Sequence, residues 1–350
     1  MLPPHVSVVE RTMDNTTRPE PDKADFPSNA PIVEQAAFLL EYAVLAPSSH
    51  NSQPWLFAVA DDEIRVYADE SRQLTVADPD GRELYLSVGC ALENLVIAAK
   101  QFGLGVTVTY ASETENRRAD DATTRHVATV RLEPDTPAKT DQDAALFDAI
   151  TERRTNHHPF QATSVPEPIL ERFEDDATTA GIGLELVTDT IRKEEIAALQ
   201  TQADERQFAD PEYRAELGYW IGSGALGASW LAARIGQLAV RHLDLGDREG
   251  RKNSTLVTSA PVIAALTATS DDLETQLDVG RVFERLALTA TSEGLAVHPM
   301  SQILEVDALR ADLAALLELE ESTPMHLFRL GYADPDTTRT PRRPLEDVTT

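Results

Sequence analysis

The chain has 350 residues, with 59 acidic against 31 basic side chains and a formal net charge of −28. This length can hold one large or two ordinary domains with a full hydrophobic core. So acidic a surface repels phosphate backbones, which argues against nucleic-acid binding. It favours a salt-rich cytoplasm, where screening removes the self-repulsion, although a plain acidic protein is an alternative.

Cys90 is the single cysteine, so the sequence holds no disulfide framework, and we expect a small buried side chain at this position. No apolar run reaches 18 residues, and no basic-then-apolar leader begins the chain. Residues 1–30 are rich in proline and charge and are predicted to form a disordered arm. We therefore expect a cytoplasmic protein that does not contact membranes.

Hydrophobic periodicity predicts a mixture of helices and strands without strict alternation, which favours an α+β fold. The expected elements are, in chain order, a helix over 31–46, strands over 55–60 and 63–68, a helix from 86, strands over 105–110 and 126–133, a helix from 144, a strand over 183–188, helices over 191–208 and 211–243, a strand over 262–268, a helix from 277, a strand over 296–304, a helix over 307–319 and a strand over 326–333. Residues 133–143 are the expected linker, so the predicted units are a half over 31–143 and a half over 144–350, which includes a Gly-rich helical cover and an extended tail.

The stretch APSSHNSQPW, residues 46–55, carries many hydrogen-bonding side chains between two prolines. Proline fixes φ at both ends, so a stiff loop is expected. Hydroxyls and amides can read the edge of a planar ring that carries donors and acceptors, such as a flavin pyrimidine. A turn packed under Trp55 is the alternative. The candidate binding residues here are Pro47, Ser48, Ser49, Asn51 and Gln53.

Residues 86–106 recur at a constant offset of 191 as residues 277–297, with nine identities in 21 positions. Both copies have the pattern of an amphipathic helix that ends at Gly-Leu and is followed by a strand. Two copies of one long unit favour an internal pseudo-dimer over a solenoid, which needs more and shorter repeats.

Two clusters of arginines stand out in so acidic a chain. Arg153 and Arg154 precede Thr155 and His157, a set that suits a phosphate and a polyol because the guanidinium matches phosphate oxygens. A helix end whose cations offset the macrodipole is the alternative. Arg342 and Arg343 lie between prolines near the C-terminus, where a solvated tail with salt bridges is the alternative.

Three other motifs give weaker evidence of function. GSGALG at 222–227, with Asp247 beyond it, matches a dinucleotide fingerprint, but a predicted helix precedes it and no strand can follow closely. The histidines lack a metal-binding spacing, so no metal is expected. Ser49 and His50 are adjacent in the chain and do not form a catalytic triad.

Together, APSSHNSQPW, RRTNHHPF, NLVIAAKQFGLG, GLAVHPMSQ and TPRRPLEDV resemble the FMN-dependent nitroreductase superfamily, and within it the Acg-type branch, in which one chain holds two halves. The resemblance spans about residues 31–350. It implies a nitroreductase-like α+β fold, internally duplicated, with mixed or antiparallel sheets flanked by helices. It also implies one FMN between the halves.

Carried over residue by residue, the resemblance puts Arg153, Thr155 and His157 on FMN, with the loop of residues 47–53 supplied by the other half. Arg342 matches a C-terminal phosphate-binding base, and Pro299, Met300 and Ser301 match the loop whose backbone passes the flavin N5 face. His157 departs from the usual arginine or lysine. The polar loop occurs in the first half and the arginine motif in the second, so one FMN per chain is expected.

The function that this resemblance implies is hydride transfer from NAD(P)H through the flavin N5 to a small electron-poor acceptor, with no catalytic residue besides the flavin. An FMN-sequestering protein with a covered site and little turnover is the alternative. A monomer that is itself a pseudo-dimer, or a loose homodimer, is expected.

Overall fold

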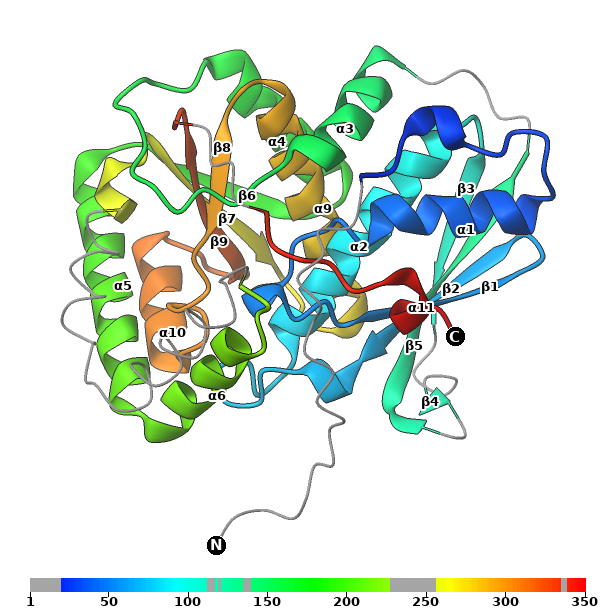
Figure 1. The fold of residues 1–350 in the computed structure, drawn as a ribbon. Coiled ribbons are helices and arrows are strands. Elements are labelled where there is room, and N and C mark those ends of the chain that lie inside the picture. The colour runs from blue at the N-terminus through cyan, green and yellow to red at the C-terminus, as the bar shows by residue number, and fades with distance from the viewer. Residues whose placement is uncertain (1–19, 112–116, 119–120, 135–139, 227–255, 335–338) are drawn as a thin grey trace, which may run out of the picture.

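The computed structural model describes residues 20–111, 117–118, 121–134, 140–226, 256–334 and 339–350 (Figure 1). Its α-helices are α1 (Ile32–Ala43), α2 (Arg82–Gln101), α3 (Asp141–Glu152), α4 (Glu167–Thr179), α5 (Thr190–Ala209), α6 (Pro211–Gly222), α9 (Leu273–Ser292), α10 (Asp307–Leu316) and α11 (Leu345–Val348). Its strands are β1 (Trp55–Ala60), β2 (Glu63–Asp69), β3 (Gly105–Tyr110), β4 (Arg117–Arg118), β5 (Asp121–Glu133), β6 (Gly183–Val187), β7 (Val262–Ala268), β8 (Ala296–Pro299) and β9 (Thr323–Gly331). Short 3₁₀ turns occur at Lys23–Asp25, Ser49–Asn51 and Glu70–Arg72.

Two antiparallel sheets share one strand order. The first runs β1-β2-β5-β3, with β4 attached to β5, and the second runs β6-β7-β9-β8. In the last pair of each sheet, the first residue of one strand faces the last residue of the other: Gly105 of β3 faces Glu133 of β5, and Ala296 of β8 faces Gly331 of β9. Gly105 and Ala296 are 191 positions apart, the offset of the sequence repeat. The sheets are therefore two copies of one topology.

Helices α2 and α9 cross at the centre of the molecule, between the two sheets (Figure 1). Gly89 lies against the carbonyl oxygen of Leu277, and Gly280 lies against that of Leu86, each so closely that a Cβ would overlap it. Leu86 and Leu277 are repeat mates, and so are Gly89 and Gly280. This reciprocal contact is what a local two-fold axis produces. The predicted α+β fold with an internally duplicated pseudo-dimer is confirmed.

The halves differ in what joins their first two strands. β1 and β2 are connected at Asp61 and Asp62, with Asp61 at φ 53°, whereas β6 and β7 are separated by residues 188–261, which include α5 and α6. The predicted helical cover over 211–243 is described as α6 only, since residues 227–255 lie outside the described part of the chain. The second half therefore carries an insertion that the first half lacks.

Several predicted boundaries were wrong. Helix α3 begins at Asp141 rather than 144, because Thr140 and Asp143 form a capping box. The strand expected over 296–304 ends at Pro299, since the chain turns there and the amides of Leu304 and Glu305 donate to Ser301 O.

Part of the predicted disordered arm packs on the first half. The ring of Phe26 stacks on Phe102 at 4.0 Å, and Tyr42 donates to Pro21 O at 3.4 Å. Residues 1–19 of the predicted arm lie outside the described residues.

The C-terminal segment crosses from the second half to the first, where α11 lies beside β1 (Figure 1). The segment is hydrogen-bonded to the first sheet, where Thr350 N donates to Phe57 O at 2.8 Å. Within the described residues, no helix combines the length and the apolar character needed to cross a membrane.

Candidate functional site

The loop after α1 has an unusual backbone. His50, Asn51 and Gln53 adopt φ angles of 51°, 52° and 51°, in the left-handed region that non-glycine residues rarely occupy. Each such residue costs on the order of 1 kcal/mol or more, and such strain clusters at functional sites. The loop that the sequence singled out is therefore held in shape by its surroundings.

Those surroundings include the C-terminal segment. Asn51 Nδ2 donates to Pro341 O at 2.9 Å and also to Ala225 O at 2.8 Å. Arg343 donates from its backbone N to Gln53 Oε1 at 2.8 Å and from Nη1 to Gln53 O at 3.0 Å. Ser48 Oγ accepts from Gln53 N at 2.9 Å within the loop. The candidate loop and the candidate C-terminal arginines thus lie together.

Two arginines from distant parts of the chain converge on one carbonyl. Arg153 Nη2 and Arg342 Nη2 donate to Leu45 O at 3.3 and 3.1 Å. The Nε atoms of both arginines are buried and make no hydrogen bond within the described residues, although that of Arg153 forms an ion pair. Burial and the neighbouring charge of Arg153 lower the pKa of Arg342 to about 9. Arg342 is further held by Thr340 Oγ1 at 2.7 Å, a residue that the sequence reasoning missed. This pair of buried cations suits an anionic ligand group.

Glu284 of α9 lies beneath the arginine pair. Its Oε1 is 3.5 Å from Arg153 Nε, and the side chain is fully buried. Burial raises the pKa of Glu284 to about 7, and the charge of Arg153 opposes that rise. Its repeat mate Glu93 has a lowered pKa instead: burial opposes the shift, but Arg285 and Arg281 outweigh it.

The raised pKa of Glu284 predicts a pH effect on stability. A carboxyl whose folded pKa exceeds its unfolded value stabilises the fold most below the unfolded pKa of 4.5, and this contribution is lost as pH rises through 7. Between pH 5 and 8 we expect the free energy of unfolding of the FMN-free wild-type protein to fall by about 2–3 kcal/mol more than that of the variant Glu284→Gln. Denaturant unfolding of both proteins across this pH range measures the difference between them. The contributions of the other buried carboxyls cancel because both proteins contain them. Parallel pH curves for the two proteins would rule the prediction out.

The segment after α3 runs beside β8. Thr155 forms a parallel bridge with Val297, and Asn156 N donates to Val297 O at 2.9 Å. The exposed ring of His157 meets the ring of His298 edge-on at 4.9 Å. Arg154 points back to the end of α3, where Nη1 donates to Thr151 O and Arg153 O at 2.9 and 2.7 Å.

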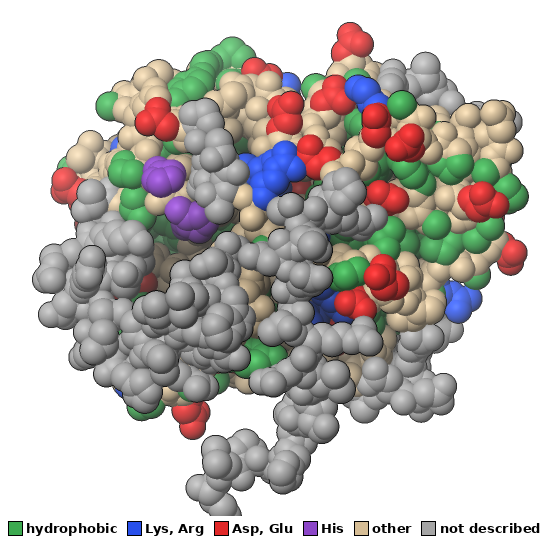
Figure 2. Space-filling view, in the orientation of Figure 1, with side chains coloured by type: hydrophobic (Ala, Val, Ile, Leu, Met, Phe, Trp, Pro, Cys, Tyr) green, Lys and Arg blue, Asp and Glu red, His purple; other side chains and the backbone are tan. Residues whose placement is uncertain are grey.

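Figure 2 shows histidine and basic side chains near the middle of one face, with acidic side chains spread around them. No group of three His, Cys, Asp or Glu side chains in the described ranges is placed to hold a metal ion.

The loop after β8 meets the polar loop through a residue that the sequence reasoning missed. Glu83, near the start of α2, accepts hydrogen bonds from Ser49 Oγ and Ser301 Oγ, each at 3.0 Å from Oε2. Ser49 of the first half and Ser301 of the second half are thereby brought to one place. Met300, between Pro299 and Ser301, is buried, and its backbone N donates to Leu327 O at 2.7 Å.

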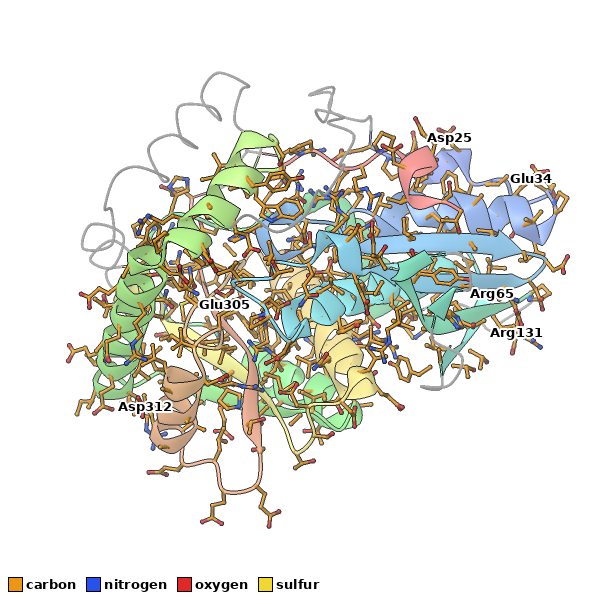
Figure 3. All side chains as sticks on the ribbon, turned by 90° about the horizontal axis from the view of Figure 1, so that it is seen from below. Asp25, Glu34, Arg65, Arg131, Glu305 and Asp312 are labelled. Carbon is orange, nitrogen blue, oxygen red and sulfur yellow. The ribbon has the colours of Figure 1, made fainter. Side chains whose placement is uncertain are left out.

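Two further carboxyls lie near Glu83. Burial and the charge of Glu83 raise the pKa of Asp78 to about 6 and that of Glu305 to about 8. Figure 3 shows Glu305 in the interior, whereas the labelled Asp25, Glu34, Arg65, Arg131 and Asp312 lie at the periphery. Most of the acidic excess is thus on the surface, whereas Asp78 and Glu83 are buried and Glu305 is half-buried beside the site.

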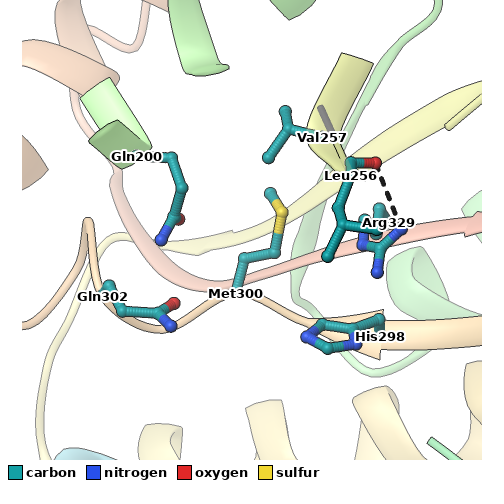
Figure 4. A pocket seen from close by; sticks show the side chains of 7 residues that line it. All are labelled: Gln200, Leu256, Val257, His298, Met300, Gln302 and Arg329. Carbon is teal, nitrogen blue, oxygen red and sulfur yellow. Dashed lines mark hydrogen bonds between the residues drawn. The ribbon is translucent and has the colours of Figure 1, made fainter. Parts of the chain in front are cut away.

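A small pocket opens on the other side of the β8 loop. It is lined by Gln200, Leu256, Val257, His298, Met300, Gln302 and Arg329. Figure 4 shows the two glutamines at one end, Arg329 and His298 at the other, and Met300 between them. The guanidinium of Arg329 donates to the carbonyl oxygens of Asn156, His158 and Leu256 at 3.1–3.3 Å, so it ties these segments to β9.

Comparison with known proteins places the chain. The nitroreductase family model matches residues 150–332. Rv3131 of Mycobacterium tuberculosis, provisionally named an NAD(P)H nitroreductase, is 31% identical over 91% of this chain and 92% of its own length. The chain belongs to the nitroreductase family.

Other relatives of this nitroreductase-family protein extend over most of its length. The Acg protein of M. tuberculosis is 26% identical over 88% of this chain and 93% of its own length. A crystal structure of a provisionally assigned nitroreductase from Anabaena variabilis covers 87% of this chain and 88% of its own, with a TM-score of 0.55 and 10% identity. The last likeness concerns the fold alone, and it extends over both halves.

Proposed function

We propose that this chain is an FMN-dependent oxidoreductase that takes hydride from NAD(P)H and passes it to a small electron-poor acceptor. Membership of the nitroreductase family and relatives that are provisionally named NAD(P)H nitroreductases support this assignment. FMN, when bound, would supply the hydride-accepting and hydride-donating ring, so the protein needs no catalytic base of its own.

The observation that carries the proposal is the convergence of Arg153 and Arg342. Two buried guanidiniums share the carbonyl of Leu45. Arg153 Nε has only the Glu284 carboxylate near it, at 3.5 Å, and Arg342 Nε has no hydrogen-bond acceptor in the described part of the chain. Unsatisfied buried donors are costly, and a phosphate offers charged oxygens that match a guanidinium fork. The residues therefore fit the FMN phosphate between the halves.

The remaining candidate residues complete the proposed site. His157, which lies exposed beside His298, would offer a hydrogen-bond donor to the cofactor. The proposed FMN-binding residues are Pro47, Ser48, Ser49, Asn51, Gln53, Arg153, Arg154, Thr155, His157, Pro299, Met300, Ser301, Arg342 and Arg343. We also propose that the halves divide near residues 143 and 144, and that one chain forms a monomer or a loose homodimer.

The test begins with titration of FMN into purified protein, followed by rapid mixing with NADH or NADPH without oxygen. We expect one FMN per chain and bleaching of its visible absorbance within seconds, followed by recovery when a nitroaromatic acceptor is added. Binding without bleaching by either nucleotide would support a flavin-sequestering protein. Protein that cannot be loaded with FMN would overturn the proposal.

A further inference from the structure

Glu83 lies where a loop from each half meets. It is the second residue of α2 and is 2% exposed. A single carboxylate oxygen accepts from Ser49 Oγ in the polar loop and from Ser301 Oγ in the loop after β8, both at 3.0 Å. These two loops are distant in the sequence, and each contributes residues to the proposed flavin site.

The surroundings keep Glu83 ionised. Arg82 Nη2 and His326 Nδ1 each lie 3.9 Å from its other oxygen, and both side chains are buried. Burial opposes ionisation, but His326, Arg82 and the hydrogen bond from Ser49 outweigh it and lower the pKa of Glu83 to about 2. An ionised carboxylate only accepts hydrogen bonds, so both serine hydroxyls must direct their hydrogens to it.

The repeat supplies a comparison for this residue. Glu274, 191 positions later, is the second residue of α9, but its side chain is exposed. An acid in the first turn suits the helix macrodipole in both copies. The macrodipole explains neither the burial of Glu83 nor its two serine partners. Of the two repeat mates, only Glu83 has these features, and it lies in the half that supplies the polar loop.

We propose that Glu83 is a positioning residue, which clamps the two flavin-binding loops of opposite halves through the hydroxyls of Ser49 and Ser301. This inference rests on the proposed function. It requires no contact between Glu83 and the cofactor, since the carboxylate acts through the serines. A loop already ordered before binding loses less conformational entropy when the ligand arrives, so the clamp strengthens FMN binding.

The test compares FMN affinities by titration of the flavin absorbance and fluorescence. We expect Glu83→Ala to weaken binding at least tenfold and Ser49→Ala or Ser301→Ala to weaken it severalfold. Glu83→Gln keeps an acceptor oxygen and is expected to stay within about threefold of wild type. Glu274→Ala is the matched control, with unchanged affinity expected.

Non-additivity is the specific signature of a clamp. Once one serine hydrogen bond to Glu83 is lost, loss of the other should weaken FMN binding little further. The double variant Ser49→Ala with Ser301→Ala is therefore expected to have the FMN affinity of the weaker single variant. These serine variants keep the test decisive even where Glu83→Ala does not fold. Additive losses, or a Glu83→Gln variant as weak as Glu83→Ala, would overturn the clamp.

Hydrogen exchange of the FMN-free protein separates this inference from the proposed function. Glu83→Ala should speed exchange at least tenfold in both residues 48–53 and residues 299–305, and Glu274→Ala should leave both unchanged. If the wild-type chain binds no FMN, the proposed function fails while this readout still reports on the clamp. Faster exchange confined to the start of α2 would show that Glu83 merely supports its own helix.

Discussion

Gly280→Ala is expected to lower the free energy of unfolding by at least about 3 kcal/mol, at or beyond the upper end of ordinary overpacking effects. The added methyl would overlap the carbonyl oxygen of Leu86, which belongs to the backbone of α2 and cannot rotate away. Alanine is the better helix former by about 1 kcal/mol, so the clash must exceed that gain before any loss is seen. Thermal and denaturant unfolding followed by circular dichroism measure the effect.

The two-fold relation supplies the matched comparison. Gly89→Ala places its methyl against Leu277 O in the same way and should cost a similar amount. Glu194→Ala, on an exposed position of α5, is expected to change stability by no more than about 0.5 kcal/mol. If both glycine variants were as stable as wild type, the close crossing of α2 and α9 would be wrong.

Arg153→Ala is expected to weaken FMN binding by about 10- to 150-fold, which corresponds to the loss of about 1.5–3 kcal/mol of charge-assisted hydrogen bonding. The substitution removes one of two guanidiniums that converge between the halves and leaves Glu284 without its 3.5 Å partner. Because a buried carboxyl without that cation is harder to ionise, Glu284 should then stay protonated to higher pH. Fluorescence titration with FMN measures the affinity.

The control for this experiment is Arg131→Ala. Arg131 also pairs with a glutamate, at 2.6 Å from Glu63, but it lies exposed on the first sheet. Its loss should leave FMN affinity within about twofold. Equal effects of the two substitutions would show that overall charge, rather than the arginine pair, controls binding.

Much of the fold could be predicted from local pattern. The helix-to-strand repeat at offset 191 indicated the duplication, and its mates do meet across the central helix crossing. Boundaries set by tertiary contacts could not be predicted in this way. Residues 296–304 are predicted to form one long strand, but the chain leaves the sheet after Pro299 to reach α10.

The candidate site could likewise be predicted only where its residues are neighbours in the sequence. Proline-bounded loops and clustered arginines are visible in a sequence because unusual residues stand next to one another. The convergence of Arg153 and Arg342 on Leu45 O joins segments far apart in the chain, and only the fold brings them together. Glu83 was missed because a glutamate in the first turn of a helix is ordinary, and its function comes from burial between Ser49 and Ser301.

The crossing of the C-terminal segment bears on the order in which the protein can mature on the ribosome. The first sheet and the polar loop are synthesised early, yet the loop is bonded by Pro341 and Arg343, and Phe57 is paired by Thr350. A nascent first half can therefore collapse around its own core but cannot finish its binding loop until residues 341–350 have been synthesised. Chains that stop before residue 341 would lack the groups that secure that loop, so they would not acquire the cofactor and its protection against degradation.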